Sequence, residues 1–175
     1  MRNVIFFCFS ILLTNLAFAI TPVNPPTKVS LVADSETVVP GSTLRIGVHF
    51  EIDPEWHIYY KEAQGTGLPT KIELALPDGF TTAGISWPTP VEFKLSDDLF
   101  GKGYIKEAFM IAPINIPHDL PEGGPVTFKA MVNWLNCSAK LCMPAKKTLE
   151  LTLRIDNAKK PDQNDLFAAW ENKVS

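Results

Sequence analysis

Two cysteines, Cys137 and Cys142, are the side chains of this sequence with the clearest capacity for chemistry. Four residues separate them, and runs of alternating apolar residues flank them at 126–134 and 149–155. A disulfide requires α-carbons about 4.4–6.8 Å apart, so the pair can close only where the chain turns back in a tight loop or hairpin. A closed pair is either a structural bond or a couple that cycles between dithiol and disulfide.

The residues around the pair leave both of these interpretations open. A structural bond across so short a loop would stabilise the fold by about 2–3 kcal/mol, which a chain with this much predicted core hardly needs. Nearby Lys140, Lys146 and Lys147 favour an active pair, because cations stabilise a thiolate. The spacing is not Cys-x-x-Cys and the flanking segments do not suggest a βαβ unit, so a thioredoxin fold is not indicated.

A metal site is a third interpretation of the same residues. Cys137, Cys142 and Met143 are soft ligands for Cu(I), and His49, His57 or His118 would have to complete the site from elsewhere in the chain. In an oxidising compartment two thiols are more often joined than metallated. We therefore assign no metal and no cofactor.

The N-terminus has the three parts of a secretory signal peptide: a cation at Arg2, an apolar run at 4–13 and a small-residue cleavage site ending at Ala19. We expect residues 1–19 to be removed and no stable membrane insertion, because the apolar run is too short to span a bilayer well. The remaining chain keeps two cysteines, with 15 basic and 19 acidic residues and a net charge of −4. This mild acidity without a basic run disfavours nucleic acid as a partner.

The segments on either side of the cysteines are expected to be strands of an all-β domain. Short segments of alternating apolar residues, separated by turn signals and 15 prolines, predict a β-sandwich. The expected strands are 28–33, 44–50, 56–61, 72–76, 85–87, 91–95, 104–116 with an interruption at Pro113, 126–134 and 149–155. An extended leader is expected at 20–27, one domain at 28–156 and a polar loop at 96–103.

The tail, residues 157–175, contains the one segment expected to be helical. Asp162 or Asn164 is a candidate N-cap. The apolar stripe of this helix consists of Leu166, Phe167, Trp170 and Val174.

Other chemistry-bearing side chains are better explained by the fold. The aromatic run at 56–60, together with Trp87 and Trp134, suits core and edge packing, and His57 is expected to be hydrogen-bonded within the fold. No serine has a histidine and aspartate pattern around it, and neither a phosphate-binding loop nor zinc spacing is present. The sequence therefore does not indicate a hydrolase.

Three segments of the sequence carry a resemblance: 54–61 (PEWHIYYK) with 67–70 (GLPT), 97–102 (DDLFGK), and 134–144 (WLNCSAKLCMP). Together they resemble the N-terminal periplasmic domain of the DsbD family of thiol:disulfide interchange proteins, including its copper-tolerance, ScsB-like relatives. The resemblance covers roughly residues 29–155. It implies an immunoglobulin-like β-sandwich with a short C-terminal helix, located in the periplasm.

The resemblance further implies that Cys137 and Cys142 form a redox-active disulfide in a protein-disulfide reductase-like component. The domain would take reducing equivalents from a thioredoxin-like or membrane thiol donor and pass them to oxidised periplasmic proteins through mixed disulfides. Cys142, the more C-terminal cysteine, would attack. The family's membrane conduit is absent before the end at Ser175, so the donor is expected to act in trans.

In such domains a cap loop covers the cysteines, and here it corresponds to Asp97, Asp98, Leu99 and Phe100. Leu99 and Phe100 would form the lid. The two carboxylates would raise the pKa of a nearby thiol, because negative charge disfavours the thiolate.

Two alternatives remain beside this interpretation. One is a secreted immunoglobulin-like interaction module whose disulfide is purely structural, and the other is a copper-handling domain of the same fold. The resemblance also associates the chain with cytochrome c biogenesis and copper tolerance.

Overall fold

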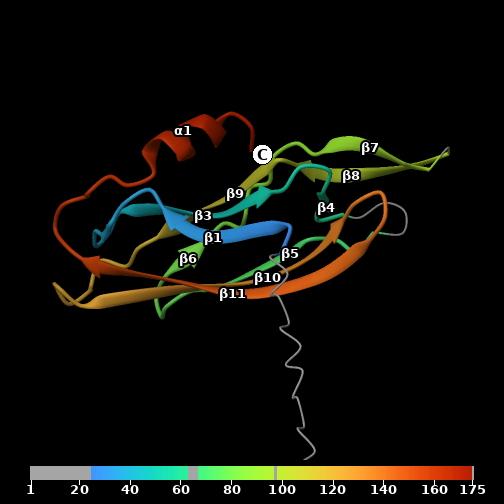
Figure 1. Cartoon of the computed structure of the whole chain (residues 1–175). Helices are drawn as coiled ribbons and strands as arrows, with labels where there is room; N and C mark the ends of the chain where they lie inside the picture. The colour runs from blue at the N-terminus through green and yellow to red at the C-terminus, as the bar shows by residue number, and fades with distance from the viewer. Residues whose placement is uncertain (1–24, 63–66, 97, 175) are drawn as a thin grey trace, which may run out of the picture.

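A computed structural model of the chain describes residues 25–62, 67–96 and 98–174, which form two packed β-sheets and one short helix (Figure 1). The predicted fold class, an immunoglobulin-like β-sandwich with a short C-terminal helix, is confirmed. The expected signal peptide at 1–19, most of the leader, and Asp97 of the expected cap loop lie outside the described residues.

The first sheet has the strand order β1-β3-β9-β6, and every pair in it is antiparallel. Its strands are β1 (Thr27–Ala33), β3 (Thr43–Ile52), β6 (Thr81–Thr82) and β9 (Glu107–Asn115). Alternation along β3 turns its apolar residues inward, so that Leu44, Ile46, Val48 and Phe50 are all buried. Phe50 meets Trp134 of the opposite sheet edge to face, with ring centroids 5.9 Å apart.

The second sheet has the order β2-β11-β10-β4-β8-β7, with β5 also paired to β10. Its strands are β2 (Thr37–Val38), β4 (His57–Tyr59), β5 (Lys71–Ala75), β7 (Val91–Ser96), β8 (Leu99–Ile105), β10 (Pro125–Cys137) and β11 (Cys142–Ile155). The β10–β11 hairpin is in continuous register from Pro125 opposite Arg154 to Cys137 opposite Cys142. The other edge of β10 is shared between β5 and then β4.

Three predicted segments differ from the structure. The strand expected at 85–87 is only an isolated bridge between Ser86 and Ile111. The run expected at 104–116 is broken at Lys106, not at Pro113, because the chain passes there from β8 in one sheet to β9 in the other. Lys106 has a φ of 66°, a left-handed conformation that turns the chain between the sheets. The polar loop expected at 96–103 is also wrong, since β8 begins at Leu99 and pairs with β7.

Helix α1 (Asn164–Glu171) packs on the outer face of the first sheet (Figure 1). The predicted caps are wrong: Gln163 occupies the N-cap in a left-handed conformation, and no side chain caps the helix. Phe167 and Trp170 are buried against Phe109 of β9, as the apolar stripe suggested, with ring centroids 4.9 and 6.4 Å from it. Tertiary packing thus stabilises a helix that lacks a capping side chain.

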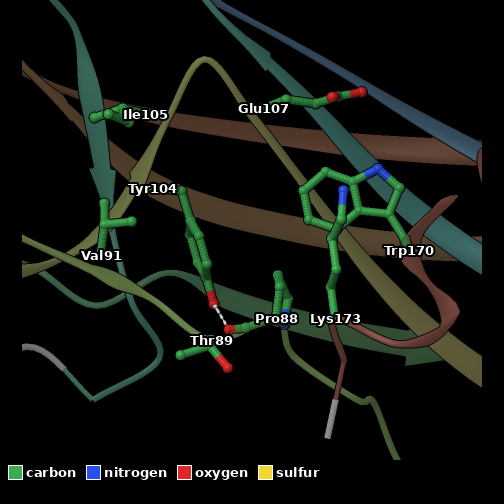
Figure 2. Close-up of a pocket in the computed structure, with 8 residues that line it drawn as sticks. All are labelled: Pro88, Thr89, Val91, Tyr104, Ile105, Glu107, Trp170 and Lys173. Atoms are coloured by element: carbon green, nitrogen blue, oxygen red, sulfur yellow. Dashed lines mark hydrogen bonds between the residues drawn. The ribbon is translucent and has the colours of Figure 1, made fainter.

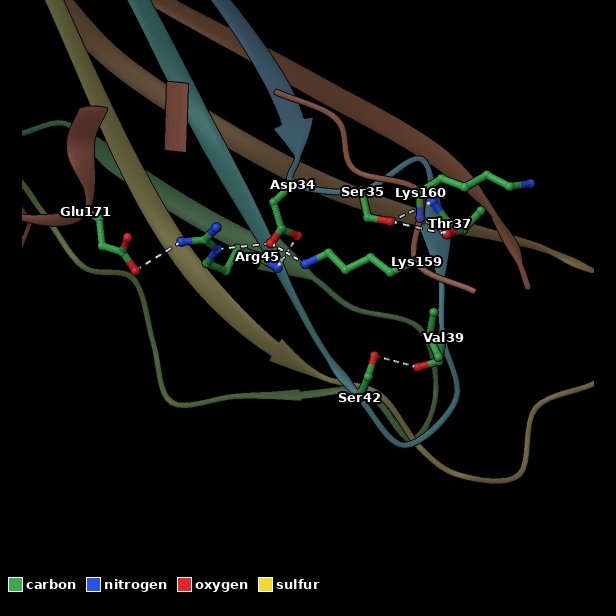
Figure 3. Close-up of polar contacts among 9 residues, drawn as sticks. All are labelled: Asp34, Ser35, Thr37, Val39, Ser42, Arg45, Lys159, Lys160 and Glu171. Carbon is green, nitrogen blue, oxygen red and sulfur yellow. Dashed lines mark hydrogen bonds and ion pairs between the residues drawn. The ribbon is translucent and has the colours of Figure 1, made fainter. Parts of the chain in front are cut away.

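The tail is also held by a buried carboxylate, Asp34, which is 2% exposed (Figure 3). Asp34 accepts hydrogen bonds from the backbone N–H and Nε of Arg45, both at 3.0 Å, and from Nζ of Lys159 at 2.7 Å. Arg45 also contacts Glu171 of the helix at 3.3 Å. Burial alone would raise the pKa of Asp34, but the bonds from Lys159 and Arg45 outweigh it and hold the pKa below 3.8.

We predict that Asp34→Asn lowers the free energy of unfolding by about 2 kcal/mol at pH 7, since it replaces a buried charge-assisted acceptor. The folded pKa is depressed, so this contribution is complete above pH 3.8 and is lost as the pH falls through the folded pKa. Urea unfolding of both proteins at several pH values measures this difference in the free energy of unfolding. Glu150→Gln is the matched control, because the Lys129–Glu150 pair is exposed. Equal losses in both variants would contradict the prediction.

Candidate functional site

Cys137 and Cys142 are joined by a disulfide at the end of the β10–β11 hairpin, with their α-carbons 4.1 Å apart. Each cysteine ends or begins its strand, and the connecting turn contains only residues 138–141. The backbone N–H of Ser138 donates to the carbonyl of Leu141 at 2.8 Å. Cys137 and Cys142 therefore occupy a narrow, non-hydrogen-bonded pair of the ladder, which is the cross-strand position with the closest side chains.

Ser138 holds this turn through its side chain. Its Oγ accepts hydrogen bonds from the backbone N–H groups of Lys140 and Leu141 at 3.3 and 3.2 Å, and lies 3.3 Å from the Leu141 carbonyl oxygen. The turn is thus closed by hydrogen bonds that do not depend on the disulfide.

The two cysteines differ in exposure. Cys137 is 1% exposed and packs with Tyr59 and Leu135, while Cys142 is exposed. Phe93 and Leu95 of β7 pack against the same cluster. An external thiolate can therefore reach Cys142, whereas Cys137 is shielded by apolar side chains.

Asn136, directly before Cys137, is a buried residue that the sequence prediction did not single out. Its Oδ1 accepts from Oγ1 of Thr27 at 2.5 Å and from Nε1 of Trp134 at 2.8 Å, and its Nδ2 donates to the Met143 carbonyl at 3.4 Å. These bonds attach the end of β10 to β1 and to β11. A polar residue within an alternating apolar strand was the signal that could have identified it.

The expected lid residues lie in strand β8. Alternation in β8 puts Leu99 on the same face as Gly101 and puts Phe100 on the opposite face, where it is 55% exposed. The side chains that pack against the Cys137 cluster are instead Phe93 and Leu95. Gly101 lies opposite Phe93 and leaves room for it, since a Cβ there would lie 2.6 Å from the Phe93 ring. The lid role of Leu99 and Phe100 remains a prediction.

The charged residues expected near Cys137 and Cys142 lie on several different elements of the structure. Asp98 is exposed at the β7–β8 turn, and its effect on the thiol pKa stays a prediction. Lys140 is exposed in the hairpin turn and Lys146 is exposed on β11. Lys147 donates from Nζ to the Val29 carbonyl at 3.0 Å, so this lysine is engaged with β1.

His57 of β4 lies directly opposite Cys137 across the β4–β10 pair. Its ring centroid is 4.1 Å from that of Phe93 and 5.3 Å from that of Tyr59. The Nε2 atom is buried and has no hydrogen-bond partner among the described residues, so the expectation of a hydrogen-bonded histidine is wrong at this atom. Burial lowers the pKa of His57 below 6.5.

The other histidines considered as copper ligands lie elsewhere. His49 contacts Glu107 at 2.6 Å on the first sheet, and the His118 ring lies against Gly41. Among residues 25–62, 67–96 and 98–174, no group of three or more histidine, cysteine, aspartate or glutamate side chains is arranged to hold a metal ion.

Two of the surface hollows that border the second sheet lie near the cysteine hairpin and near the tail. A groove of about 580 Å³ begins beside the cysteine hairpin and is lined by Leu68, Pro69, Lys71, Glu73, Asn133, Trp134, Pro144, Ala145 and Lys146. A second, of about 340 Å³, lies between β8 and the tail (Figure 2). In the second hollow the Tyr104 hydroxyl donates to the Pro88 carbonyl at 2.8 Å, and burial raises the pKa of Tyr104. The first groove has apolar side chains and the lysines Lys71 and Lys146 in its lining, which reaches Pro144, two residues after Cys142.

The sequence and the fold of this chain are similar to those of known proteins. A family model described as "Thiol:disulfide interchange protein DsbD, N-terminal" matches residues 28–154. The N-terminal periplasmic domain of ScsB from Proteus mirabilis has a TM-score of 0.60 and 17% identity, covering 88% of this chain. The chain spans 56% of that structure. The reduced N-terminal domain of Neisseria meningitidis DsbD has a TM-score of 0.44 and 15% identity, over 77% of this chain and 90% of that one.

No curated protein sequence matches the chain significantly. In the described part of the chain, no helix has the length and apolar character needed to cross a membrane.

We predict that Phe93→Ala accelerates reduction of the disulfide by dithiothreitol severalfold, because the leaving Cys137 thiolate would gain solvation. The rate is measured by alkylating free thiols at successive times and weighing the products. Phe100→Ala is the matched control: it also removes a phenyl ring from the β7–β8 hairpin, but from the opposite face. Faster reduction in Phe100→Ala or Leu99→Ala, with Phe93→Ala unchanged, would restore the lid predicted from the sequence.

Proposed function

The chain belongs to the family of N-terminal domains of the thiol:disulfide interchange protein DsbD, and on this premise we propose that it exchanges disulfides with other proteins through Cys137 and Cys142. The observation that carries the proposal is the pairing of an exposed sulfur with a buried one. The exposed Cys142 is the sulfur that partner thiolates attack. The buried Cys137 reacts only with Cys142, when the internal disulfide forms or breaks.

In the reducing half of the cycle, a donor thiolate attacks Sγ of Cys142, and Cys137 leaves with the bonding electrons and takes a proton. A second donor thiol then displaces Cys142, leaving the dithiol form. In the delivering half, Cys142 attacks a substrate disulfide, and Cys137 attacks Cys142 to reform the internal disulfide. Each cycle carries two electrons and two protons from donor to substrate.

A purely structural disulfide explains the geometry less well. The hairpin end is already held by the buried Asn136 and by the Ser138 turn. A bond that closes only a four-residue loop between paired strands adds little constraint to such a hairpin. Exposure of Cys142 is also a disadvantage for a bond whose role is to persist.

The proposed donor is a thioredoxin-like or membrane thiol protein acting in trans, and the proposed acceptors are oxidised periplasmic proteins. Residues 28–156 would form the exchange domain, followed by the tail at 157–175. The signal-peptide pattern at 1–19 and the periplasmic origin of the similar ScsB domain support a periplasmic location. By the same resemblance, the acceptors would belong to cytochrome c biogenesis or copper tolerance.

We predict that Cys137→Ser forms persistent mixed disulfides with a thioredoxin-like protein whose second active-site cysteine is replaced by serine and whose remaining cysteine carries a thionitrobenzoate group. The exposed Cys142 displaces that group as thionitrobenzoate, and neither protein then keeps a resolving thiol. Cys142→Ser should trap little, since its remaining thiol is buried. Non-reducing electrophoresis and intact mass measure the adducts, and urea unfolding checks that both variants fold. Equal trapping by the two variants would contradict the assigned roles. If both lose much stability and trap nothing, the disulfide is structural.

The reduction potential of the Cys137–Cys142 couple is predicted to lie between about −180 and −270 mV, in the range of exchange-active thiols. The protein is equilibrated in glutathione or dithiothreitol buffers, and free thiols are counted by alkylation and mass. A value below about −300 mV would mark a structural bond and would end the exchange proposal.

A further inference from the structure

The second half of thiol exchange places a chemical demand on Cys137. As a thiol it must lose a proton before its sulfur can attack Cys142, yet it sits among apolar side chains, where burial disfavours the thiolate. Lys140 is in the exposed turn and Lys147 bonds the Val29 carbonyl, so neither lysine serves a buried sulfur well. A neutral base beside Cys137 would meet this demand.

His57 occupies that place. Residues directly opposite on antiparallel strands point to the same face with Cβ atoms about 4.5–5.5 Å apart, and Cys137 is the direct partner of His57. Cys142 is the partner of Cys137 on its other side, so the three side chains form one row across β4, β10 and β11. The Phe93 ring, 4.1 Å from the imidazole, holds the ring in this row.

Nε2 of His57 is the one buried side-chain nitrogen or oxygen without a hydrogen-bond partner among the described residues. A buried polar atom without a partner is destabilising, and an atom of this kind often has a functional explanation. In the disulfide form Cys137 has no proton to donate. Reduction creates an S–H group opposite His57, and Nε2 can accept from it when the imidazole proton is on Nδ1.

The surroundings keep the imidazole neutral. The titratable groups nearest His57 on its face of the sheet are Tyr59 of β4 and the two cysteines of β10 and β11. Further along the same face lie exposed charged side chains: Lys71 and Glu73 of β5, Lys129 of β10, and Lys146 and Glu150 of β11. β7 presents Phe93 there, and β8 presents Ile105 and Gly103, none of which titrates. The charged residues of these two strands, Glu92, Lys94 and Lys102, alternate to the opposite face. Burial lowers the pKa of His57, so the neutral base predominates at pH 7.

We propose that His57 is the proton acceptor for Cys137 in the step that resolves the mixed disulfide, an inference that rests on the proposed exchange function. Nε2 takes the proton from Sγ of Cys137, and this sulfur bonds to Sγ of Cys142. The bond between Cys142 and the substrate sulfur breaks, and the substrate leaves as a thiolate with both bonding electrons. The imidazolium then returns the proton to the leaving thiolate or to water.

The test follows the two steps separately. Reduced protein is mixed with the coloured disulfide dithiobis(nitrobenzoate) in a stopped-flow instrument. The first equivalent of coloured thiolate reports attack by Cys142, and the second reports attack by Cys137 on the mixed disulfide. His57→Gln removes the titrating base, and His57→Phe keeps an aromatic ring against Phe93. His49→Gln is the control, a part-buried histidine of the first sheet.

At pH 7 both His57 variants should slow the second phase at least about tenfold and leave the first phase unchanged, as expected for loss of a general base. Between pH 6.5 and 8 the wild-type second phase should change little. In the variants it should rise about tenfold per pH unit, because only preformed thiolate reacts. His49→Gln should match the wild type.

A slower second phase with the wild-type pH profile would assign His57 a packing role and overturn the inference, as would unchanged kinetics. These failures leave the exchange function intact, because both equivalents are still released. If the wild-type protein releases no second equivalent, the exchange function itself fails. Urea unfolding of the variants separates loss of the base from loss of the fold.

Discussion

The antiparallel register of β10 is the constraint on which the site depends. It places Cys137 opposite Cys142 on one side and opposite His57 on the other. A slip of one residue would move each of these side chains to the other face of the sheet. The buried Asn136, bonded to Thr27 and Trp134, opposes such a slip, because its displacement would leave several polar groups unpaired in the core.

That register also explains how one disulfide obtains two unlike sulfurs. β10 lies inside the sheet, flanked by β11 and β4, and apolar side chains from β7 pack over its end. Among the described strands, the short β2 alone pairs with the other edge of β11, far from the hairpin tip, and Cys142 is exposed. Position within the sheet, more than the chemistry of the cysteines themselves, makes Cys142 exposed and Cys137 buried.

Strands and helices that show a periodic pattern of apolar residues in the sequence were predicted well. Period-two alternation identified most strands, including the two long ones around the cysteines, and the stripe of Phe167 and Trp170 identified the tail helix. Two of the failures fall where distant segments meet. Lys106 interrupts an apolar run because the chain changes sheets there, and Gln163 replaces the expected caps because packing on β9 holds the helix. Neither event has a local cause that a pattern can reveal.

By itself, the sequence determined the fold class, the candidate cysteine pair and, through family resemblance, the chemistry expected of it, because periodicity and motifs are properties of neighbouring residues. Only the tertiary structure decided which sulfur is buried, that Phe93 packs over it, and that His57 stands beside it. His57 and Cys137 are 80 positions apart in the chain. Their contact arises from strand pairing and burial, which depend on the whole sandwich closing around its core.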